Sequence, residues 1–321
     1  MDSFAGKLAV VTGGGSGMGR ELVLQLAAEG CSVAACDIDP ASVSETAGRA
    51  AAGSRITTHV CDVADEGQVV RFRDEVVRGH ARDHVNLVFN NAGIGGGGSF
   101  IADDREDWER TFAIDWWGVY YCTRAFLPLL MASDDGYLVN TSSANGFWAS
   151  LGPGVPHTAY STAKFAVKGF SEALIEDLRV HAPHVKVAVV MPGHVGTDII
   201  GNSRRVLGSA EVEDMPDADL ERLRDQLTRR GLQADDMSMD QLRQVVKMVE
   251  QGFRQAAPLD AAQAAAIILD GVRAGRWRIL VGDDAKELDE RVRADPEGAY
   301  DHSGADLGTI LLGASQATPT P

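Results

Sequence analysis

The sequence of 321 residues has few cysteines, no excess of positive charge and no long apolar segment. Its four cysteines, Cys31, Cys36, Cys61 and Cys122, show neither C-x-x-C spacing nor a cluster with histidine, so we expect reduced thiols in the core. No cluster of His, Asp or Glu has metal-ligand spacing, and we expect no catalytic metal. The formal net charge of -16 argues against nucleic acid or an anionic membrane as a partner and favours a small organic ligand. No run of about 18 apolar residues and no secretory leader pattern occur, which predicts a cytoplasmic protein.

Short runs rich in Val, Ile and Ala alternate with longer helical patterns from residue 7 to about residue 200. Near-continuous apolar strands separated by helices are typical of a parallel sheet that helices cover on both faces. The pattern therefore predicts a doubly wound α/β fold in one domain, residues 1–321. The expected strands are residues 7–11, 32–36, 55–60, 86–90, 137–141, 185–190 and 276–282.

Residues 198–258 interrupt this alternation with an acidic helical stretch, which we call the insertion. Leu220, Leu223 and Leu227 share one helix face, and residues 238–241 (SMDQ) have the form of a capping box. These apolar faces could bind a partner or pack on a core of their own. At the carboxyl edge of the sheet, the insertion would act as a lid over the substrate. The polar end of the chain, 313–321, is expected to be disordered.

Five glycines lie between Thr12 and Gly19, in the turn that joins the first strand to the first helix. A helix N-terminus that faces such a turn presents free N–H groups and partial positive charge, which suit a pyrophosphate. Gly13 would permit the tight turn, Gly17 would let the backbone approach the ligand, and Gly19 would let the helix pack close to the strand. A structural loop without a ligand is the alternative.

Asp37 ends the second strand, eighteen residues after Gly19. A carboxylate at this point can accept hydrogen bonds from both hydroxyls of an adenosine ribose, and it would repel a 2′-phosphate. Position 16 in the glycine-rich turn is Ser, and no Arg or Lys follows Asp37 until Arg49. These residues predict NAD rather than NADP as the cofactor.

Tyr160 and Lys164 lie four positions apart on one face of a helix that is expected to run to about His181. The preceding strand ends in two hydroxyls, Ser142 and Ser143, at the sheet edge where open α/β sheets bind ligands. The pKa of tyrosine, near 10, must fall by about three units for proton exchange near pH 7. One ammonium at about 4 Å supplies about 4 kcal/mol at an effective dielectric of about 20, so Lys164 and an oxidised nicotinamide together could suffice.

Five motifs occur in the order and spacing of a known family. They are Thr12–Gly19, "NNAG" (90–93), "SSANG" (142–146), "YSTAK" (160–164) and "PGHVGT" (192–197). In these motifs the chain resembles the short-chain dehydrogenase/reductase family, over about residues 5–200 and the last strand. The resemblance implies a seven-stranded Rossmann sheet, a homodimer or homotetramer, and hydride transfer between a nicotinamide and an alcohol or carbonyl.

By this resemblance, Tyr160 exchanges a proton with the substrate oxygen, Lys164 also holds the nicotinamide ribose, and Ser143 holds the substrate oxygen. For each remaining position, the alternative is a turn residue without a ligand. The cofactor contacts that the turn, Asp37 and the resemblance together imply are Gly13, Ser16, Gly17, Met18, Gly19, Asp37, Asp62, Val63, Asn91, Ala92, Gly93, Tyr160, Lys164, Pro192, Gly193, Val195 and Thr197.

One position departs from the family, which usually has Asn where this chain has Asp115. In the family, the main-chain carbonyl of that residue lies at a helix kink and holds a water near the lysine. An ionised Asp115 would favour the charged form of Lys164, disfavour a tyrosinate at Tyr160 and move the pH optimum upward. The alternative is a tolerated variant with little kinetic effect.

The family draws its substrate pocket from loops that here contain Phe147, Trp148 and His194. These side chains predict an apolar pocket, and hence a hydrophobic secondary alcohol or its ketone as substrate. Two alternatives remain: an epimerase or lyase that retains NAD, and a regulator that senses NAD without turnover. The complete set of Ser143, Tyr160 and Lys164 argues against the epimerase or lyase, whereas Asp115 and a lengthened gap between Ser143 and Tyr160 favour the regulator.

Overall fold

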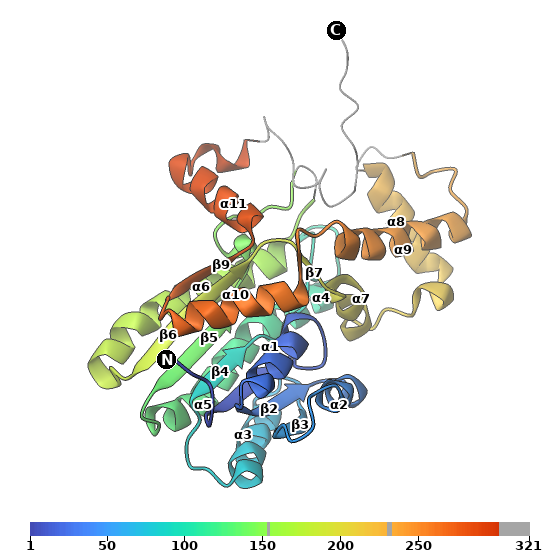
Figure 1. Ribbon diagram of the computed structural model, residues 1–321. Helices are drawn as coiled ribbons and strands as arrows, with labels where there is room; N and C mark the ends of the chain where they lie inside the picture. The colour runs from blue at the N-terminus through green and yellow to red at the C-terminus, as the bar shows by residue number, and fades with distance from the viewer. Residues whose placement is uncertain (153–154, 230–232, 302–321) are drawn as a thin grey trace.

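The computed structural model describes residues 1–152, 155–229 and 233–301 (Figure 1). Its centre is a parallel seven-stranded sheet in the order β3-β2-β1-β4-β5-β6-β9. The strands are β1 (Leu8–Thr12), β2 (Ser32–Asp37), β3 (Ile56–Val60), β4 (Leu87–Asn90), β5 (Gly136–Thr141), β6 (Val185–Pro192) and β9 (Arg278–Val281). Each predicted strand and the doubly wound fold are confirmed. The predicted disordered end, 313–321, lies outside the described residues.

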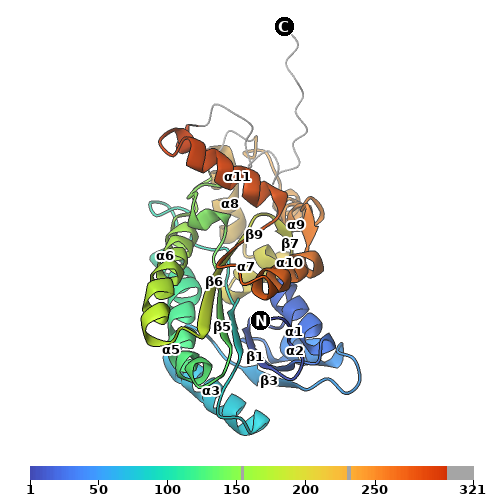
Figure 2. The ribbon, with the colours of Figure 1, turned by 60° about the vertical axis from the view of Figure 1, so that its left-hand side comes forward.

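Helices cover both faces of the sheet, and Figure 2 shows the two layers. One face carries α1 (Gly17–Ala28), α2 (Pro40–Gly48) and α10 (Ala261–Arg273). The other carries α3 (Glu66–His80), α5 (Gly118–Met131) and α6 (Thr158–His181). Before α5 come α4 (Arg105–Phe112) and a π-helical turn, Ala113–Trp117, and α11 (Asp283–Ala294) follows β9.

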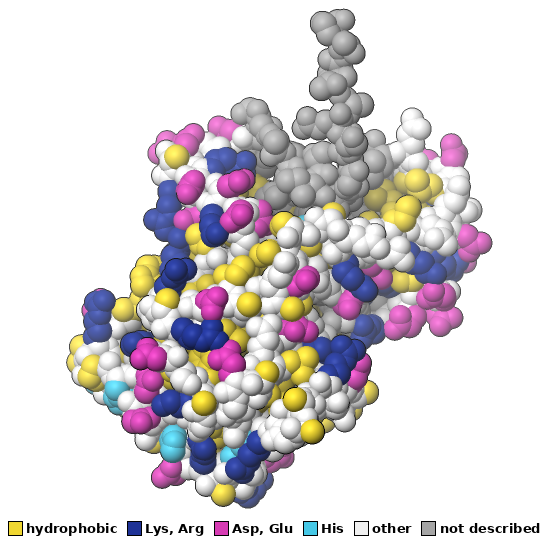
Figure 3. Space-filling model, viewed as in Figure 1, with side chains coloured by type: hydrophobic (Ala, Val, Ile, Leu, Met, Phe, Trp, Pro, Cys, Tyr) yellow, Lys and Arg dark blue, Asp and Glu magenta, His cyan; other side chains and the backbone are white. Residues whose placement is uncertain are grey.

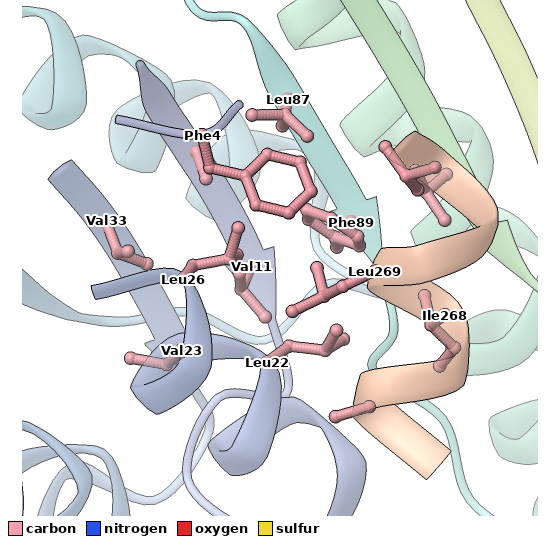
Figure 4. Close-up of a cluster of buried hydrophobic side chains, with 14 of the residues drawn as sticks. Phe4, Val11, Leu22, Val23, Leu26, Val33, Leu87, Phe89, Ile268 and Leu269 are labelled. Atoms are coloured by element: carbon pink, nitrogen blue, oxygen red, sulfur yellow. The ribbon is translucent and has the colours of Figure 1, made fainter. Parts of the chain in front are cut away.

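Two apolar cores fill the space between the sheet and its helices. Figure 4 shows the first, in which Phe4, Leu26, Leu87 and Leu269 are fully or almost fully buried between the sheet, α1 and α10. Burying one such side chain contributes about 1.5–3 kcal/mol. All four cysteines are free and buried, one in this core and three in the opposite one, as the composition predicts.

The insertion forms α7 (Ile199–Val206), α8 (Asp217–Arg229) and α9 (Met239–Gln255). Its two ends meet where β7 (Val195–Gly196) pairs with β8 (Leu259–Asp260) in a short parallel ladder. Leu220 and Leu242 are fully buried in a small core that α8 and α9 share, so the predicted apolar faces pack on each other. The predicted capping box is present at the start of α9, between Ser238 and Gln241.

The surface carries both signs of charge, and on the face in Figure 3 basic and acidic side chains are interspersed. Such a mixture offers little attraction to a polyanion. Among the described helices, none combines the length and the apolar character that crossing a bilayer requires.

Candidate active site

A cleft of about 490 Å³ opens at the carboxyl ends of the central strands. The strand order reverses between β1 and β4, and open α/β sheets bind their ligands at such a point. The predicted cofactor residues that line the cleft are Gly13, Ser16, Gly17, Met18, Asp37, Asp62, Val63, Asn91, Ala92, Gly93 and Thr197. The other predicted residues, Gly19, Tyr160, Lys164, Pro192, Gly193 and Val195, lie outside its lining.

The glycine-rich turn has the geometry that its sequence predicts at two positions. Gly13 has a φ of +67°, and a Cβ there would lie 2.8 Å from the Cα of Ala92. A Cβ on Gly19 would lie 2.0 Å from the carbonyl oxygen of Gly13, so α1 packs directly on the turn. Ser16, the N-cap of α1, makes no side-chain bond to the helix, which leaves the first N–H groups of α1 without a side-chain cap.

Asp37 lies at the end of the cleft nearest α2. One of its oxygens accepts a hydrogen bond from the N–H of Gly15 (2.9 Å), and the other accepts one from the N–H of Asp39 (3.1 Å). Burial raises the pKa of Asp37, and these two hydrogen bonds oppose the rise. A carboxylate oxygen has two lone pairs, so Asp37 can still accept bonds from a ligand in the cleft.

Sequence reasoning missed several residues of the cleft lining, Arg20 and Arg110 among them. Arg49, at the end of α2, also lines the cleft, and its guanidinium pairs with Glu45. The insertion also lines it through α7, where the Asn202 amide donates to the Ser16 hydroxyl (3.0 Å). The local signal in the sequence for the α7 residues is the start of a helix after β7.

Tyr160 and Lys164 lie together on α6, next to the end of β5. The Lys164 ammonium is 5.2 Å from the centre of the Tyr160 ring and donates to the carbonyl of Thr141 (3.3 Å). Ser142 donates to the carbonyl of Lys164 (2.7 Å), the structural role expected of that hydroxyl. Ser143 is the hydroxyl close to the phenol, and its interaction with Tyr160 lowers the phenol pKa.

Asp115 forms a buried ion pair with Lys164. It lies in the π-helical turn before α5 and is fully buried, and its Oδ1 is 3.1 Å from Lys164 Nζ. The same oxygen accepts a hydrogen bond from the N–H of Ile94 (3.1 Å), while Oδ2 has no partner among the described residues. Burial raises the pKa of Asp115 to about 6 against the opposing effect of Lys164. For Lys164, burial lowers the pKa, but Asp115 and Tyr160 outweigh it and the pKa is raised.

The expected effect of Lys164 on Tyr160 is present but does not dominate. Burial raises the pKa of Tyr160, Lys164 lowers it, and Asp115 raises it again, so the net direction is upward. The effect of Asp115 has the direction that the sequence predicts, whereas the expected fall of about three units in the pKa of Tyr160 did not take burial into account. Because the Asp115 charge partly cancels the effect of Lys164, further positive charge is needed to lower the pKa of the Tyr160 phenol to near 7.

The three side chains expected in the substrate pocket lie outside the lining of the 490 Å³ cleft. Trp148 is almost fully buried beneath α11, and its Nε1 donates to the carbonyl of Ala299 (2.8 Å). Phe147 packs on the same cluster. The imidazole of His194 pairs through Nε2 with the carbonyl of Phe253 in α9 (2.6 Å) and therefore connects the loop after β6 to the insertion. The sequence did not predict that α11, which has no family motif, packs on Phe147 and Trp148. The assignment of the three side chains to the substrate pocket stays a prediction.

Comparison with known proteins agrees with this geometry. The family model described as short chain dehydrogenase matches residues 7–207. The chain belongs to the short-chain dehydrogenase family. This short-chain dehydrogenase is 35% identical over 294 residues to SadH of Mycobacterium tuberculosis, which is named as an oxidoreductase by assignment only. The match covers 91% of this chain and 92% of SadH.

Two further proteins are similar to this short-chain dehydrogenase. Human epidermal retinol dehydrogenase 2 is 33% identical over 197 residues, which are 60% of this chain and 62% of that protein. A short-chain dehydrogenase/reductase of Burkholderia phymatum, solved in complex with NAD, superposes with a TM-score of 0.75 at 25% identity. That superposition covers 95% of this chain and 99% of the other. The protein is thus an oxidoreductase of this family with an NAD-binding Rossmann fold.

Proposed function

We propose that this enzyme transfers a hydride between NAD(H) and a hydrophobic secondary alcohol or its ketone, with Tyr160 as general acid/base. The observation that carries the proposal is that the cleft reaches the proposed catalytic side chains at Gly93. Gly93 lines the cleft, and a Cβ there would lie 3.1 Å from Lys164 Nζ and 2.5 Å from Asp115 Oδ1. A molecule that fills the cleft as far as Gly93 therefore ends beside Lys164 and Tyr160.

The residues of the cleft fit NAD. The uncapped N-terminus of α1 suits the pyrophosphate, Asp37 suits the adenosine ribose, and the end of the cleft at Gly93 brings the nicotinamide toward Lys164. NAD, when bound, supplies the hydride acceptor or, in its reduced form, the donor. The NAD complex of the related Burkholderia protein supports this choice.

The side chains supply the proton transfer. In alcohol oxidation, the ionised Tyr160 oxygen accepts the proton of the substrate hydroxyl; in ketone reduction, the neutral phenol returns a proton to the substrate oxygen. Ser143, adjacent to the phenol, holds that oxygen by a hydrogen bond. Lys164 stabilises the ionised phenol, since its pKa is raised and it stays charged at neutral pH.

The surroundings of Tyr160 favour an uncharged substrate. The ring of His157 stacks on the Tyr160 ring, with centroids 4.5 Å apart and planes 15° apart. Burial lowers the pKa of His157 to about 4, so this imidazole is neutral at pH 7. The name of the human relative, a retinol dehydrogenase, indicates an apolar alcohol as the substrate of that protein. Because residues of α7 line the cleft, the insertion would act as the lid of this site.

An activity screen tests the proposal. Purified protein is incubated with a panel of hydrophobic secondary alcohols and NAD or NADP, and reduced cofactor is followed at 340 nm. Steady NADH production is the expected result. Loss of substrate stereochemistry without net NADH would indicate an epimerase instead, and NAD binding without turnover of any alcohol or ketone would indicate a regulator.

Asp37→Ala is expected to weaken NAD binding and to narrow the preference for NAD over NADP. The carboxylate accepts bonds from the ribose hydroxyls and repels a 2′-phosphate, and two charge-assisted hydrogen bonds of about 1.5–3 kcal/mol each set an upper limit on the loss. Dissociation constants of both cofactors, measured by calorimetry for wild type and variant, give the result. A wild type that already prefers NADP contradicts this assignment of Asp37.

We propose that the enzyme assembles with copies of itself through an aromatic surface on the π-helical turn, α5 and α6. Its residues, which contact one another in a chain of ring pairs, are Trp116, Trp117, Tyr120, Tyr121 and Phe170. Trp117 is 40% exposed. Exposed apolar surface of this kind is typical of protein interfaces. Light scattering is expected to give the mass of a dimer or tetramer, and Trp117→Glu is expected to lower it.

A further inference from the structure

The helix that carries Tyr160 begins without a side-chain cap. Tyr160 is the third residue of α6, and the N-cap residue, His157, makes no side-chain hydrogen bond to the helix. The first four N–H groups of a helix have no partner inside it, and a helix end without acceptors frays. A catalytic residue in the first turn needs that turn held in place.

A run of four glycines, Gly95–Gly98, supplies the missing acceptors. The carbonyl of Gly97 accepts a hydrogen bond from the N–H of Ala159 (3.0 Å), and the carbonyl of Gly98 accepts one from the N–H of Thr158 (2.9 Å). The Thr158 hydroxyl also donates to the Gly98 carbonyl (2.9 Å) and accepts from the Trp108 indole (3.1 Å). The backbone of this loop therefore caps α6 directly before Tyr160.

Gly97 has no space for a side chain. A Cβ on Gly97 would lie 2.4 Å from the Cβ of Ala159 and 3.3 Å from the Cα of Trp108, and its φ of +62° disfavours other residues. Ala159 is fully buried and directly precedes Tyr160. Gly95, two positions earlier, differs, because its nearest neighbour would be the Ser203 hydroxyl at 3.9 Å. The loop thus offers a tight position and a roomy one within three residues.

We propose that Gly97 is a positioning residue, which sets the place of Tyr160 by holding the first turn of α6 through backbone hydrogen bonds at a separation that only glycine allows. This inference rests on the proposed role of Tyr160. A side chain at position 97 would displace Ala159, and Tyr160 with it, from their places beside the loop. A displacement of about 1 Å at a reacting group costs about 10²-fold in rate.

Gly97→Ala tests the inference, with Gly95→Ala as the matched control. We expect Gly97→Ala to lower kcat by about 10²-fold and the affinity for NADH, followed by fluorescence, to change less than about twofold, because the residue lies outside the cleft lining. The apparent pKa of alcohol oxidation should shift, since a displaced phenol changes its distance from Ser143 and Lys164, which both lower its pKa. Gly95→Ala should keep the wild-type kcat within about twofold, because its Cβ has space.

A size exchange separates positioning from general damage. Ala159→Gly removes the Cβ that opposes position 97, so the double variant Gly97→Ala/Ala159→Gly is expected to regain about tenfold in kcat over Gly97→Ala, the φ strain preventing full recovery. If Gly97→Ala does not fold, Thr158→Val, which removes the hydroxyl bond to Gly98, should lower kcat several-fold at unchanged NADH affinity.

Three results would overturn the inference: a Gly97→Ala enzyme as active as Gly95→Ala, a loss of NADH affinity that parallels the loss of kcat, or a double variant no better than the single one. If Gly97→Ala does not fold, a Thr158→Val enzyme with wild-type kcat would also overturn the inference. A wild type without dehydrogenase activity, or one in which Tyr160→Phe is fully active, would instead reject the proposed function.

Discussion

Tyr160→Phe is expected to lower kcat by about 10²-fold or more, the usual scale for the loss of a general acid/base. The substitution removes only the hydroxyl, so the ring still stacks on His157 and still lies 5.2 Å from the Lys164 ammonium. The affinity for NADH should therefore stay close to that of the wild type. Steady-state kinetics on the best alcohol of the screen and NADH fluorescence titration give the two quantities.

The matched control for Tyr160→Phe is Tyr137→Phe. Tyr137 is fully buried, and its hydroxyl donates to the carbonyl of Arg276 (2.9 Å) at the far side of the sheet from Tyr160. Its loss should cost stability of about 1 kcal/mol and little activity. Undiminished turnover of Tyr160→Phe would remove Tyr160 from the mechanism, whereas a parallel loss of NADH binding would assign it to the cofactor site.

Lys164→Met is expected to destabilise the fold by about 3–5 kcal/mol at neutral pH, beyond its loss of activity. It leaves Asp115 as an unpaired carboxylate in a fully buried position, and breaking a buried ion pair from one side costs about this much. Asp115→Asn in the same chain removes the stranded charge, so the double variant should regain most of the loss. Urea unfolding at fixed protein concentration measures both.

The half-buried pair between Lys168 and Glu172, one turn further along α6, is the control. Lys168→Met should cost less than about 1 kcal/mol, because solvent still reaches this pair and screens it. A cost for Lys164→Met no larger than that of Lys168→Met would contradict the buried ion pair, and so would a double variant as unstable as the single one.

The pH dependence of these variants follows from the raised pKa of Asp115. Its value of about 6 in the fold exceeds the ordinary value of 3.8, so the native state holds this proton more tightly than the unfolded state. The contribution of Asp115 to stability is therefore greatest below pH 4 and falls as the pH rises toward 6. Removing the ammonium raises the pKa of Asp115 further, so the loss of stability in Lys164→Met should shrink when the pH is lowered from 8 to 5.

Asp115→Asn alone should move the pH optimum of alcohol oxidation to lower pH, because the Asp115 charge raises the pKa of Tyr160.

The candidate site was predictable where its chemistry is local in sequence. The period of a helix is enough to predict that Tyr160 and Lys164 lie on one face. A turn that follows a strand is enough to predict the role of Gly13. The environment of Trp148 was not predictable, because that side chain packs against α11, more than a hundred residues later in the chain. Spacing could not show this contact, because it arises from side-chain packing between segments with no common motif.

The sequence by itself determined the order of strands and helices along the chain, the glycine-rich turn and the residue types of the candidate catalytic group. These features depend on apolar periodicity, turn chemistry and positions four apart, all of which are properties of short segments. Only the tertiary structure decided that Asp115 pairs with Lys164, that the Gly97 carbonyl caps the helix of Tyr160, and that α7 lines the cleft at the carboxyl ends of the strands. Each of these contacts joins segments whose separation is set by packing in three dimensions, and burial then fixes the strength of the charges that meet there.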